Sequence, residues 1–269
     1  MSSASLALVG NTTARMQELS ASDHVLRMPL PLSRRVGFVS LRGGSGTSAT
    51  AAYVASLYAR RRAGMVLGVN AASGALGMPW HAGVPEGSVQ RSSAARLGAR
   101  RAADAVDGLP RTPSGLYSFD LGPESAAGPP DAATWLEHLP PIARFFDVVA
   151  TDWGTRSWRL DLAPVAAASH VVCVVARADR HALEDAAAVV PALLEHEDRP
   201  RVVVAAVDVG RTGGRAAGLL AARLDVPVLP IPYDAARAAA RPASSTALGT
   251  RTRIAYTALA TTLLREAQR

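Results

Sequence analysis

The most constraining feature of the sequence is the stretch from Val36 to Ala49, where a short apolar run leads into a glycine-rich turn and then into a helical pattern. Val36–Leu41 is short, apolar and partly β-branched, which is typical of a strand buried on both faces. Glycines at positions 43, 44 and 46 allow backbone N–H groups to converge at a helix N-terminus, where the helix dipole favours an anion. The stretch therefore predicts a turn shaped to hold a phosphate group.

The side chains of a working phosphate loop are incomplete in this turn. Such a loop places a lysine on the β- and γ-phosphates and a following Ser or Thr on the magnesium ion. Here Thr47 stands at the lysine position and Ser48 follows it, and the chain contains no lysine at all. Three interpretations stay open: a phosphate site, the remnant of one, and a tight strand-to-helix turn without a ligand.

The positive charge of the chain rests on arginine alone. The 269 residues carry 29 arginines against 22 acidic residues, a formal net charge of +7. Such an excess favours nucleic acid or an anionic surface as a partner, but the arginines are scattered, which a GC-rich genome also explains. The only clusters are Arg60–Arg62 and the group Arg91, Arg96, Arg100 and Arg101.

The remaining composition indicates a cytoplasmic protein without disulfides. The single cysteine, Cys173, lies in an apolar run, which predicts a buried thiol. No run approaches the roughly 20 apolar residues that span a bilayer. The first ten residues lack the basic flank and long apolar core of a secretory signal.

Apolar runs alternate with helical patterns along most of the chain, which predicts an α/β fold. We expect three layers: a mostly parallel, twisted sheet with helices on both faces. We assign residues 1–33 to a flexible leader, with a short edge strand near Val25–Met28, and residues 34–269 to one domain. A helix with a basic face is expected over Ser88–Val106, and two prolines place the strand Val226–Ile231 at an edge of the sheet. The other expected strands are Val36–Leu41, Met65–Asn70, Leu116–Asp120, Phe145–Asp152, His170–Ala176 and Arg201–Val207.

Four segments in this order resemble the MinD/ParA group of deviant-Walker P-loop ATPases, of the SIMIBI class. The family's first turn, Lys-Gly-Gly-x-Gly-Lys-Thr-Thr, matches Arg42–Ala49. Its Asp-x-Asp falls on Asn70–Ala72, its Walker B strand on Phe146–Asp152, and its late Pro-Val-x-x-Ile-Pro-Tyr-Asp on Pro227–Asp234. The resemblance covers residues 34–266 and implies a P-loop NTPase-like fold with ATP and Mg²⁺ as cofactors.

The resemblance also implies roles for individual residues. Arg42 corresponds to the signature lysine that reaches the partner's phosphates in a nucleotide-sandwich dimer, and arginine keeps that charge. Ser48 and Asp152 correspond to the magnesium groups, and Arg42 and Asp152 are the candidate catalytic residues. The implied nucleotide-binding residues are Arg42, Gly43, Gly44, Ser45, Gly46, Thr47, Ser48, Asn70, Pro232 and Asp234.

The departures from the family pattern bear on catalysis. Thr47 removes the lysine charge, Asn70 replaces the acid expected to position the attacking water, and the asparagine that reads adenine in relatives falls near Ala205. Because phosphoryl transfer depends on positioning and charge neutralisation, these changes predict that hydrolysis is lost. Trp153, directly after Asp152, is expected to fill part of the site.

Three functions follow as hypotheses. The leading one is a pseudo-ATPase that acts as a localisation or assembly factor for division, chromosome partitioning or a pilus or secretion machine, through a homodimer or a protein partner. The alternatives are a slow or atypical Mg-ATPase of the same family and a non-specific DNA-binding module that uses the arginine clusters. Membrane attachment of the MinD kind needs an amphipathic tail beyond the last helix, and we expect none here.

Overall fold

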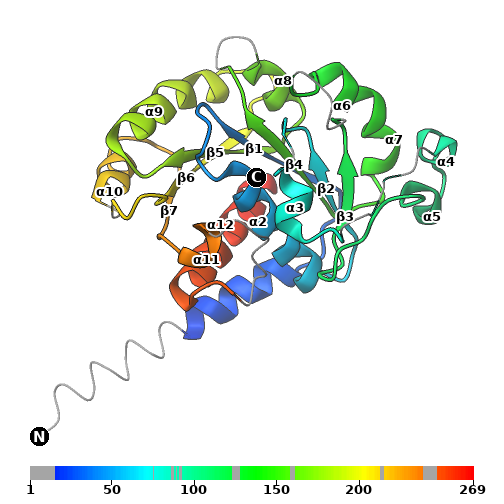
Figure 1. Ribbon diagram of the computed structural model, residues 1–269, viewed down its shortest axis with the longest axis horizontal. Coiled ribbons are helices and arrows are strands. Elements are labelled where there is room, and N and C mark those ends of the chain that lie inside the picture. Colours follow the sequence, from blue (N-terminus) through cyan, green and yellow to red (C-terminus); the bar gives the residue numbers. More distant parts are fainter. Residues whose placement is uncertain are drawn as a thin grey trace, which may run out of the picture.

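The computed structural model describes residues 16–74, 76–85, 88, 90, 93–122, 128–157, 161–212, 215–238 and 247–269, and a seven-stranded sheet forms its centre (Figure 1). The strand order is β3-β2-β4-β1-β5-β6-β7, and all neighbouring strands pair in parallel. The strands are β1 (Arg34–Ser40), β2 (Val66–Asn70), β3 (Tyr117–Asp120), β4 (Val148–Thr155), β5 (Val171–Arg177), β6 (Arg201–Val207) and β7 (Val228–Ile231). The expected α/β class is confirmed, and the proline-containing β7 lies at an edge as predicted.

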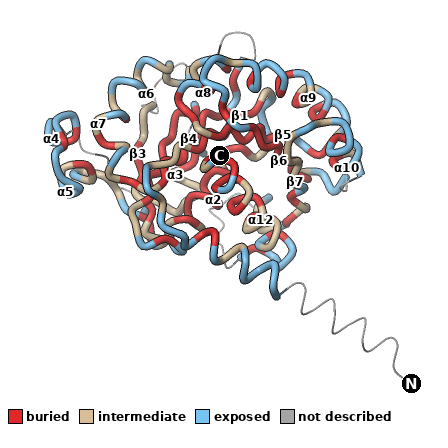
Figure 2. Tube along the Cα trace, turned by 180° about the vertical axis from the view of Figure 1, so that it is seen from behind, coloured by how far each residue is buried: buried red, intermediate tan, exposed pale blue. Residues whose placement is uncertain are grey.

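Helices cover both faces of the sheet (Figure 1). One face carries α2 (Thr47–Arg61), α3 (Met78–Ala82), α11 (Ala235–Ala238) and α12 (Thr250–Ala267). The other carries α6 (Ala132–His138), α7 (Pro140–Ala143), α8 (Leu162–Ala167), α9 (Arg180–Leu194) and α10 (Arg215–Ala221). The buried residues accordingly form two apolar clusters, one on each face, and Figure 2 shows the sheet buried between exposed helix surfaces. No helix in the described ranges combines the length and the apolar character needed to cross a membrane.

The segment before β1 differs from the expectation. Residues 16–27 are helical, and Val25 and Leu26 belong to the apolar cluster that contains the side chains of α2 and α12. The edge strand expected near Val25–Met28 is therefore wrong. The carbonyls of Leu26, in the last turn of this helix, and of Met28, just after it, accept hydrogen bonds from the buried guanidinium of Arg62, a contact that local sequence preference does not reveal. The rest of the expected leader, residues 1–15, lies outside the described residues.

The long helix expected over Ser88–Val106 is also wrong. Two short helices, α4 (Ala94–Leu97) and α5 (Ala102–Ala105), occupy part of this range. Gly98 ends the first of them. The carboxylate of Asp104 then accepts the backbone N–H groups of Arg100 and Arg101, and this capping arrangement starts the second helix as a separate element.

Candidate functional site

The glycine-rich turn lies between β1 and α2 at the carboxyl edge of the sheet, where ligands bind in open α/β folds. Gly44 and Gly46 have φ values of 74° and 80°, in the left-handed region that glycine enters without strain. Gly46 stands at the N-cap of α2, and within the described residues no side chain caps this helix. The first N–H groups of α2 are therefore available to an anion.

A pocket of about 230 Å³ opens at this turn. It is lined by Ser40, Gly44, Ser45, Gly46, Thr47, Ser48, Ala49, Ala72, Ser73, Leu76, His81, Gly154 and Thr155. The segment Gly44–Ser48 therefore brings five of the predicted nucleotide-binding residues together. Six lining residues carry hydroxyl groups, and none of the described lining residues is an arginine. Pockets that enclose drug-sized ligands measure roughly 300–1,000 Å³, so this space fits a phosphate chain better than a whole nucleotide.

His81 of α3 is the only titratable side chain among the described lining residues. Burial lowers its pKa to about 4, so the imidazole is neutral at pH 7 and contributes no positive charge to the pocket. The hydroxyl groups and the N-terminus of α2 therefore supply the attraction for an anion.

Arg42 does not line the pocket. Its guanidinium donates to the carboxylate of Asp185 and lies 2.8 Å from Nε2 of His181, and both partners belong to α9. The carbonyl of Arg42 also accepts the hydroxyl of Ser45 at 2.9 Å. The positive charge implied for a phosphate contact is thus engaged within the same chain, and a contact in trans requires this ion pair to break.

Asp152 lies within β4, which continues to Thr155 instead of ending at the acid. The pairing of β1 with β4 shifts between Phe38 and Val39, so that Trp153 has no partner on β1. Gly154, with φ of 65°, completes this bulge. The bulge turns Gly154 and Thr155 towards the pocket, and the N–H of Gly154 donates to Oδ1 of Asp152 at 3.0 Å.

The surroundings of Asp152 fit a magnesium site. The residue is fully buried, and its Oδ2 has no hydrogen-bond partner among the described residues. Burial raises its pKa to about 6, although the hydroxyl of Ser48 and the N–H groups of Gly154 and Met78 act to lower it. A buried, unpaired carboxylate oxygen beside a hydroxyl at a helix N-terminus suits a cation that is held partly through water. No group of three or more His, Cys, Asp or Glu suited to a metal occurs in the described ranges, so the remaining ligands would be water and phosphate oxygens.

Replacing Asp152 by asparagine is expected to stabilise the protein above pH 6 in metal-free buffer. The folded pKa of about 6 exceeds the ordinary 3.8, so this group stabilises the fold below about pH 4 and loses that contribution as the pH rises through 6. The full difference corresponds to about 3 kcal/mol. Thermal unfolding at about pH 5 and about pH 8 measures about half of it, roughly 1.4 kcal/mol, because pH 5 lies between the two pKa values; the exposed Asp225→Asn is the control. Equal pH dependence in the wild type and Asp152→Asn would contradict this assignment.

Asn70 and Asp152 are paired residues on neighbouring strands, β2 and β4. The amide of Asn70 donates to Oδ1 of Asp120 at 3.0 Å, and its own Oδ1 has no partner among the described residues. Asn70 is buried and does not line the pocket. Its described contacts hold the ends of β2 and β3 together beside the site.

Three other predicted nucleotide-binding residues also lie outside the pocket lining. Gly43 is exposed in the turn, and Pro232 follows β7 at the sheet edge. Asp234 accepts the N–H groups of Ala236 and Gly249, each at 2.9 Å, and so caps α11 and holds the start of α12. Burial acts to raise the pKa of Asp234, but these hydrogen bonds outweigh it and leave the pKa lowered. The described contacts of Asp234 are those of a helix cap.

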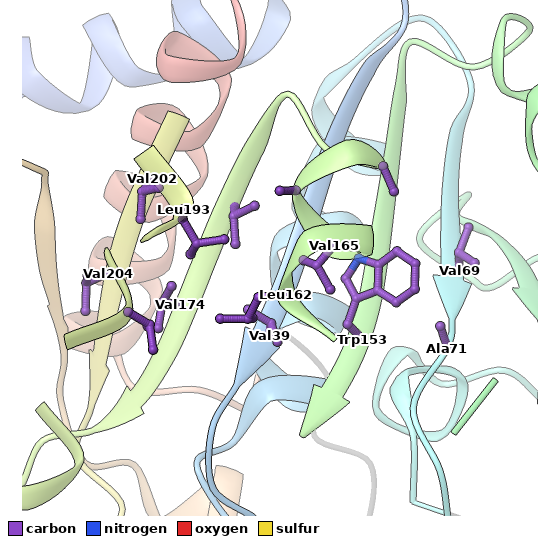
Figure 3. Close-up of a cluster of buried hydrophobic side chains, with 14 of the residues drawn as sticks. Val39, Val69, Ala71, Trp153, Leu162, Val165, Val174, Leu193, Val202 and Val204 are labelled. Atoms are coloured by element: carbon purple, nitrogen blue, oxygen red, sulfur yellow. The ribbon is translucent and has the colours of Figure 1, made fainter. Parts of the chain in front are cut away.

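The expectation that Trp153 fills the site is wrong. Its indole is 1% exposed and belongs to the apolar cluster on the α6–α10 face, opposite to α2. Figure 3 shows it between Val165 of α8 and Val69 of β2. Successive side chains of a strand point to opposite faces, so Asp152 faces α2 and Trp153 faces away from it.

Sequence reasoning missed several residues of the site. Ser40, Ser73 and Thr155 each lie at or just beyond the carboxyl end of a strand, and that position was the available signal. His81 carried no such signal, since it reaches the pocket through the short helix α3, which lies in a segment rich in glycine and proline, residues that favour turns over helices. The pairing of Arg42 with α9 joins positions 143 residues apart, which no local pattern predicts.

Much of the two arginine clusters is used for internal contacts. Four members hold described partners: Arg61 with Asp23, Arg62 with Asp147, Arg96 over the ring of Phe119, and Arg101 with Asp104. Arg91 lies outside the described residues. A DNA-binding surface built from these clusters stays a prediction, with fewer free cations than the sequence implied.

The fold is that of known P-loop ATPases. No protein-family model matches the chain, and no curated protein matches it in sequence. Among solved structures, the ParA family ATPase from Chlorobium tepidum TLS aligns with a TM-score of 0.61 and 18% identity, over 84% of this chain and 98% of that one. MinD from Pyrococcus horikoshii OT3, complexed with Mg-ADP, aligns with a TM-score of 0.58 and 19% sequence identity, over 85% of this chain and 94% of that one.

A third alignment extends the likeness to a biosynthetic enzyme. Cobyrinic acid a,c-diamide synthase from Mycobacterium smegmatis, with bound ADP and magnesium, gives a TM-score of 0.55 and 19% identity over 87% of this chain and 94% of that one. At these identities the likeness shows the fold, which is structurally similar to the ParA and MinD ATPases.

Proposed function

We propose that this protein is a ParA/MinD-like P-loop protein that has lost ATP hydrolysis and acts as a localisation or assembly factor through protein contacts. One observation carries the proposal. No cationic side chain is among the described residues that line the pocket at the glycine-rich turn, hereafter the phosphate pocket, and Arg42 is engaged with Asp185 and His181 of α9. The machinery for neutralising a triphosphate is therefore incomplete.

Magnitudes support the loss of hydrolysis rather than of all binding. A hydrogen bond between neutral groups contributes about 0.5–1.5 kcal/mol, whereas one to a charged group contributes about 1.5–3 kcal/mol. Hydrogen bonds from the hydroxyls and the N–H groups to anionic phosphate oxygens belong to this stronger kind and support binding, but these neutral donors leave the net charge of a triphosphate uncompensated. A cation that strengthens its hold as charge develops on the transferred phosphoryl group is what raises the rate.

A slow Mg-ATPase is the second candidate, and Oδ2 of Asp152 is the observation that favours it. Magnesium, when bound, neutralises charge on the β- and γ-phosphates. Ser48 would hold the ion directly, and Asp152 would orient a water bound to it. The N–H groups at the start of α2 would position the phosphates, and neutral His81 can donate or accept one hydrogen bond at the pocket wall.

The fold supports a role in assembly because a protein of this fold is known with a protein partner. The MinC:MinD cell division complex from Aquifex aeolicus aligns with a TM-score of 0.56 and 16% identity, over 88% of this chain and 94% of that one. In the present chain the engaged Arg42 favours a monomer or a dimer that forms without nucleotide.

Measurements of ATP turnover and of molecular mass with and without Mg-ATP test the proposal. We expect no turnover above background and no change in mass, for the wild type and for Asp152→Ala alike. Glu197→Ala, which removes an exposed acid, serves as the matched control. Turnover that Asp152→Ala abolishes and Glu197→Ala preserves would establish the slow ATPase instead.

A further inference from the structure

A groove of about 460 Å³ runs between α2 and α12, which lie side by side on one face of the sheet (Figure 1). It is lined by Tyr53, Leu57, Arg60, Arg61, Leu248, Arg253, Tyr256 and Thr257. The groove shares no lining residue with the phosphate pocket and has twice its volume. It is therefore a separate site on the flank of the domain.

The floor of the groove is apolar and aromatic. The rings of Tyr53 and Tyr256 lie 5.1 Å apart between centroids and are tilted by 44°. Leu57 of α2 and Leu248, just before α12, complete the floor. A floor of this kind takes aliphatic or aromatic side chains from a ligand.

The rim of the groove is positively charged. Arg60, Arg61 and Arg253 contribute three guanidinium groups, and no acidic residue is among the described lining residues. Asp23 of the helix at residues 16–27 pairs with Arg61 at one end of the groove. Arg60 has no described ion-pair partner; burial, together with the charge of Arg61, lowers its pKa. Arg60 and Arg253 thus remain as lining cations without an ion-pair partner among the described residues.

Arg253 is placed where the helix dipole disfavours it. It lies in the first turn of α12, whose first turn contains no acidic residue. Cations stabilise the last turn of a helix and destabilise the first. Arg60 and Arg61 lie in the last turn of α2 and follow this rule. Arg253 lies in the first turn of α12 and opposes it. Arg251 shares this unfavourable turn, but only Arg253 of the two is among the described lining residues of the groove, where it also donates to the hydroxyl of Thr250 at 3.2 Å.

The hydroxyl of Tyr53 has no acceptor among the described residues. The side chain is 5% exposed and its hydroxyl has no hydrogen-bond partner among the described residues. Buried tyrosine hydroxyls usually find a partner. Burial also holds the pKa of Tyr53 well above its usual value, so the group remains a donor at neutral pH. Tyr53 therefore contributes to the groove a buried donor for which no described residue supplies an acceptor.

Charge complementarity identifies the kind of occupant. Residues 1–15 and 239–246, which lie outside the described ranges, contain no aspartate or glutamate, so neither segment supplies carboxylates for Arg60 and Arg253. A ligand must combine apolar side chains for the floor with carboxylates for the rim. An acidic amphipathic helix presents both, at spacings of three and four residues.

We propose that the groove between α2 and α12 binds an acidic amphipathic segment of a partner protein. Leucine-like side chains of the segment contact Tyr53, Leu57 and Tyr256, and its carboxylates pair with Arg60 and Arg253. The groove sets partner choice through charge and is independent of nucleotide.

Fluorescence anisotropy with a designed helical peptide of about 18 residues tests this, since shorter isolated helices are marginal in water. The peptide carries leucines at helical spacing and glutamates beside them, and a second peptide carries lysine in place of every glutamate. We expect the glutamate peptide to bind the wild type in low salt and the lysine peptide not to bind.

Arg253→Glu is the decisive variant because it separates folding from binding. It removes a cation from a helix N-terminus and adds an anion there, so the Tm should not fall. Binding of the glutamate peptide should fall by at least roughly tenfold. Arg251→Glu makes the same change in the same first turn but lies outside the groove, and should leave binding within about threefold.

Three results would overturn the proposal. The first is that the glutamate peptide does not bind the wild type. The second is that Arg251→Glu and Arg253→Glu lose binding equally. The third is that the protein binds anionic phospholipid vesicles but not the peptide. The last would assign the groove to a membrane surface.

Discussion

Replacing Thr47 by lysine is expected to raise the affinity for Mg-ATP by roughly 10- to 100-fold. The estimate follows from a charged hydrogen bond of about 1.5–3 kcal/mol and about 1.4 kcal/mol for each factor of ten. Thr47 is the first residue of α2, lines the pocket and is 6% exposed. A lysine there would bring the pocket its first cationic side chain among the described lining residues.

Thr47→Met controls for side-chain length without charge. Isothermal titration with Mg-ATP compares both variants with the wild type. Equal affinities of the two variants for Mg-ATP would show that the turn does not hold phosphates, since the added lysine would then have no phosphate group to contact. A gain in affinity without turnover would separate binding from catalysis and leave Asn70 and Arg42 as further departures to account for.

Replacing Arg62 by methionine is expected to destabilise the protein by about 2–4 kcal/mol. The side chain is 1% exposed and donates to Asp147 at 3.0 and 3.2 Å and to the carbonyls of Leu26 and Met28, each at 2.9 Å. Breaking a buried ion pair costs about 3–5 kcal/mol. Asp147 is 31% exposed, so solvent reduces that figure.

Urea unfolding measures the loss, and hydrogen exchange locates it at residues 16–27. Arg61→Met is the matched control because Arg61 is the preceding residue and its one partner within the described ranges is Asp23, in an exposed ion pair. Such a pair contributes about 0–1 kcal/mol. Equal destabilisation by the two variants would mean that Arg62 does not fasten helix 16–27 to the domain.

The fold was largely predictable because its strands can be identified from the local sequence pattern. Buried parallel strands are continuous apolar runs between glycines, prolines and helical patterns. The expected bounds of β6 are those observed, those of β5 differ by one residue, and those of β1 differ by up to two. The helix at residues 16–27 was not predictable in this way. Its apolar residues are few, and contacts with Arg62 and the α2–α12 cluster hold it in place.

The sequence alone determined the backbone of the site, and the tertiary structure decided where its side chains point. Glycines at positions 44 and 46 permit left-handed φ values whatever surrounds them, so the turn at the start of α2 follows from residue type. The direction of Arg42 towards α9, the burial of Trp153 behind β4 and the capping role of Asp234 depend on elements far away in the chain. A side chain can rotate to whichever partner the packed fold supplies, and that choice is made only when the layers come together.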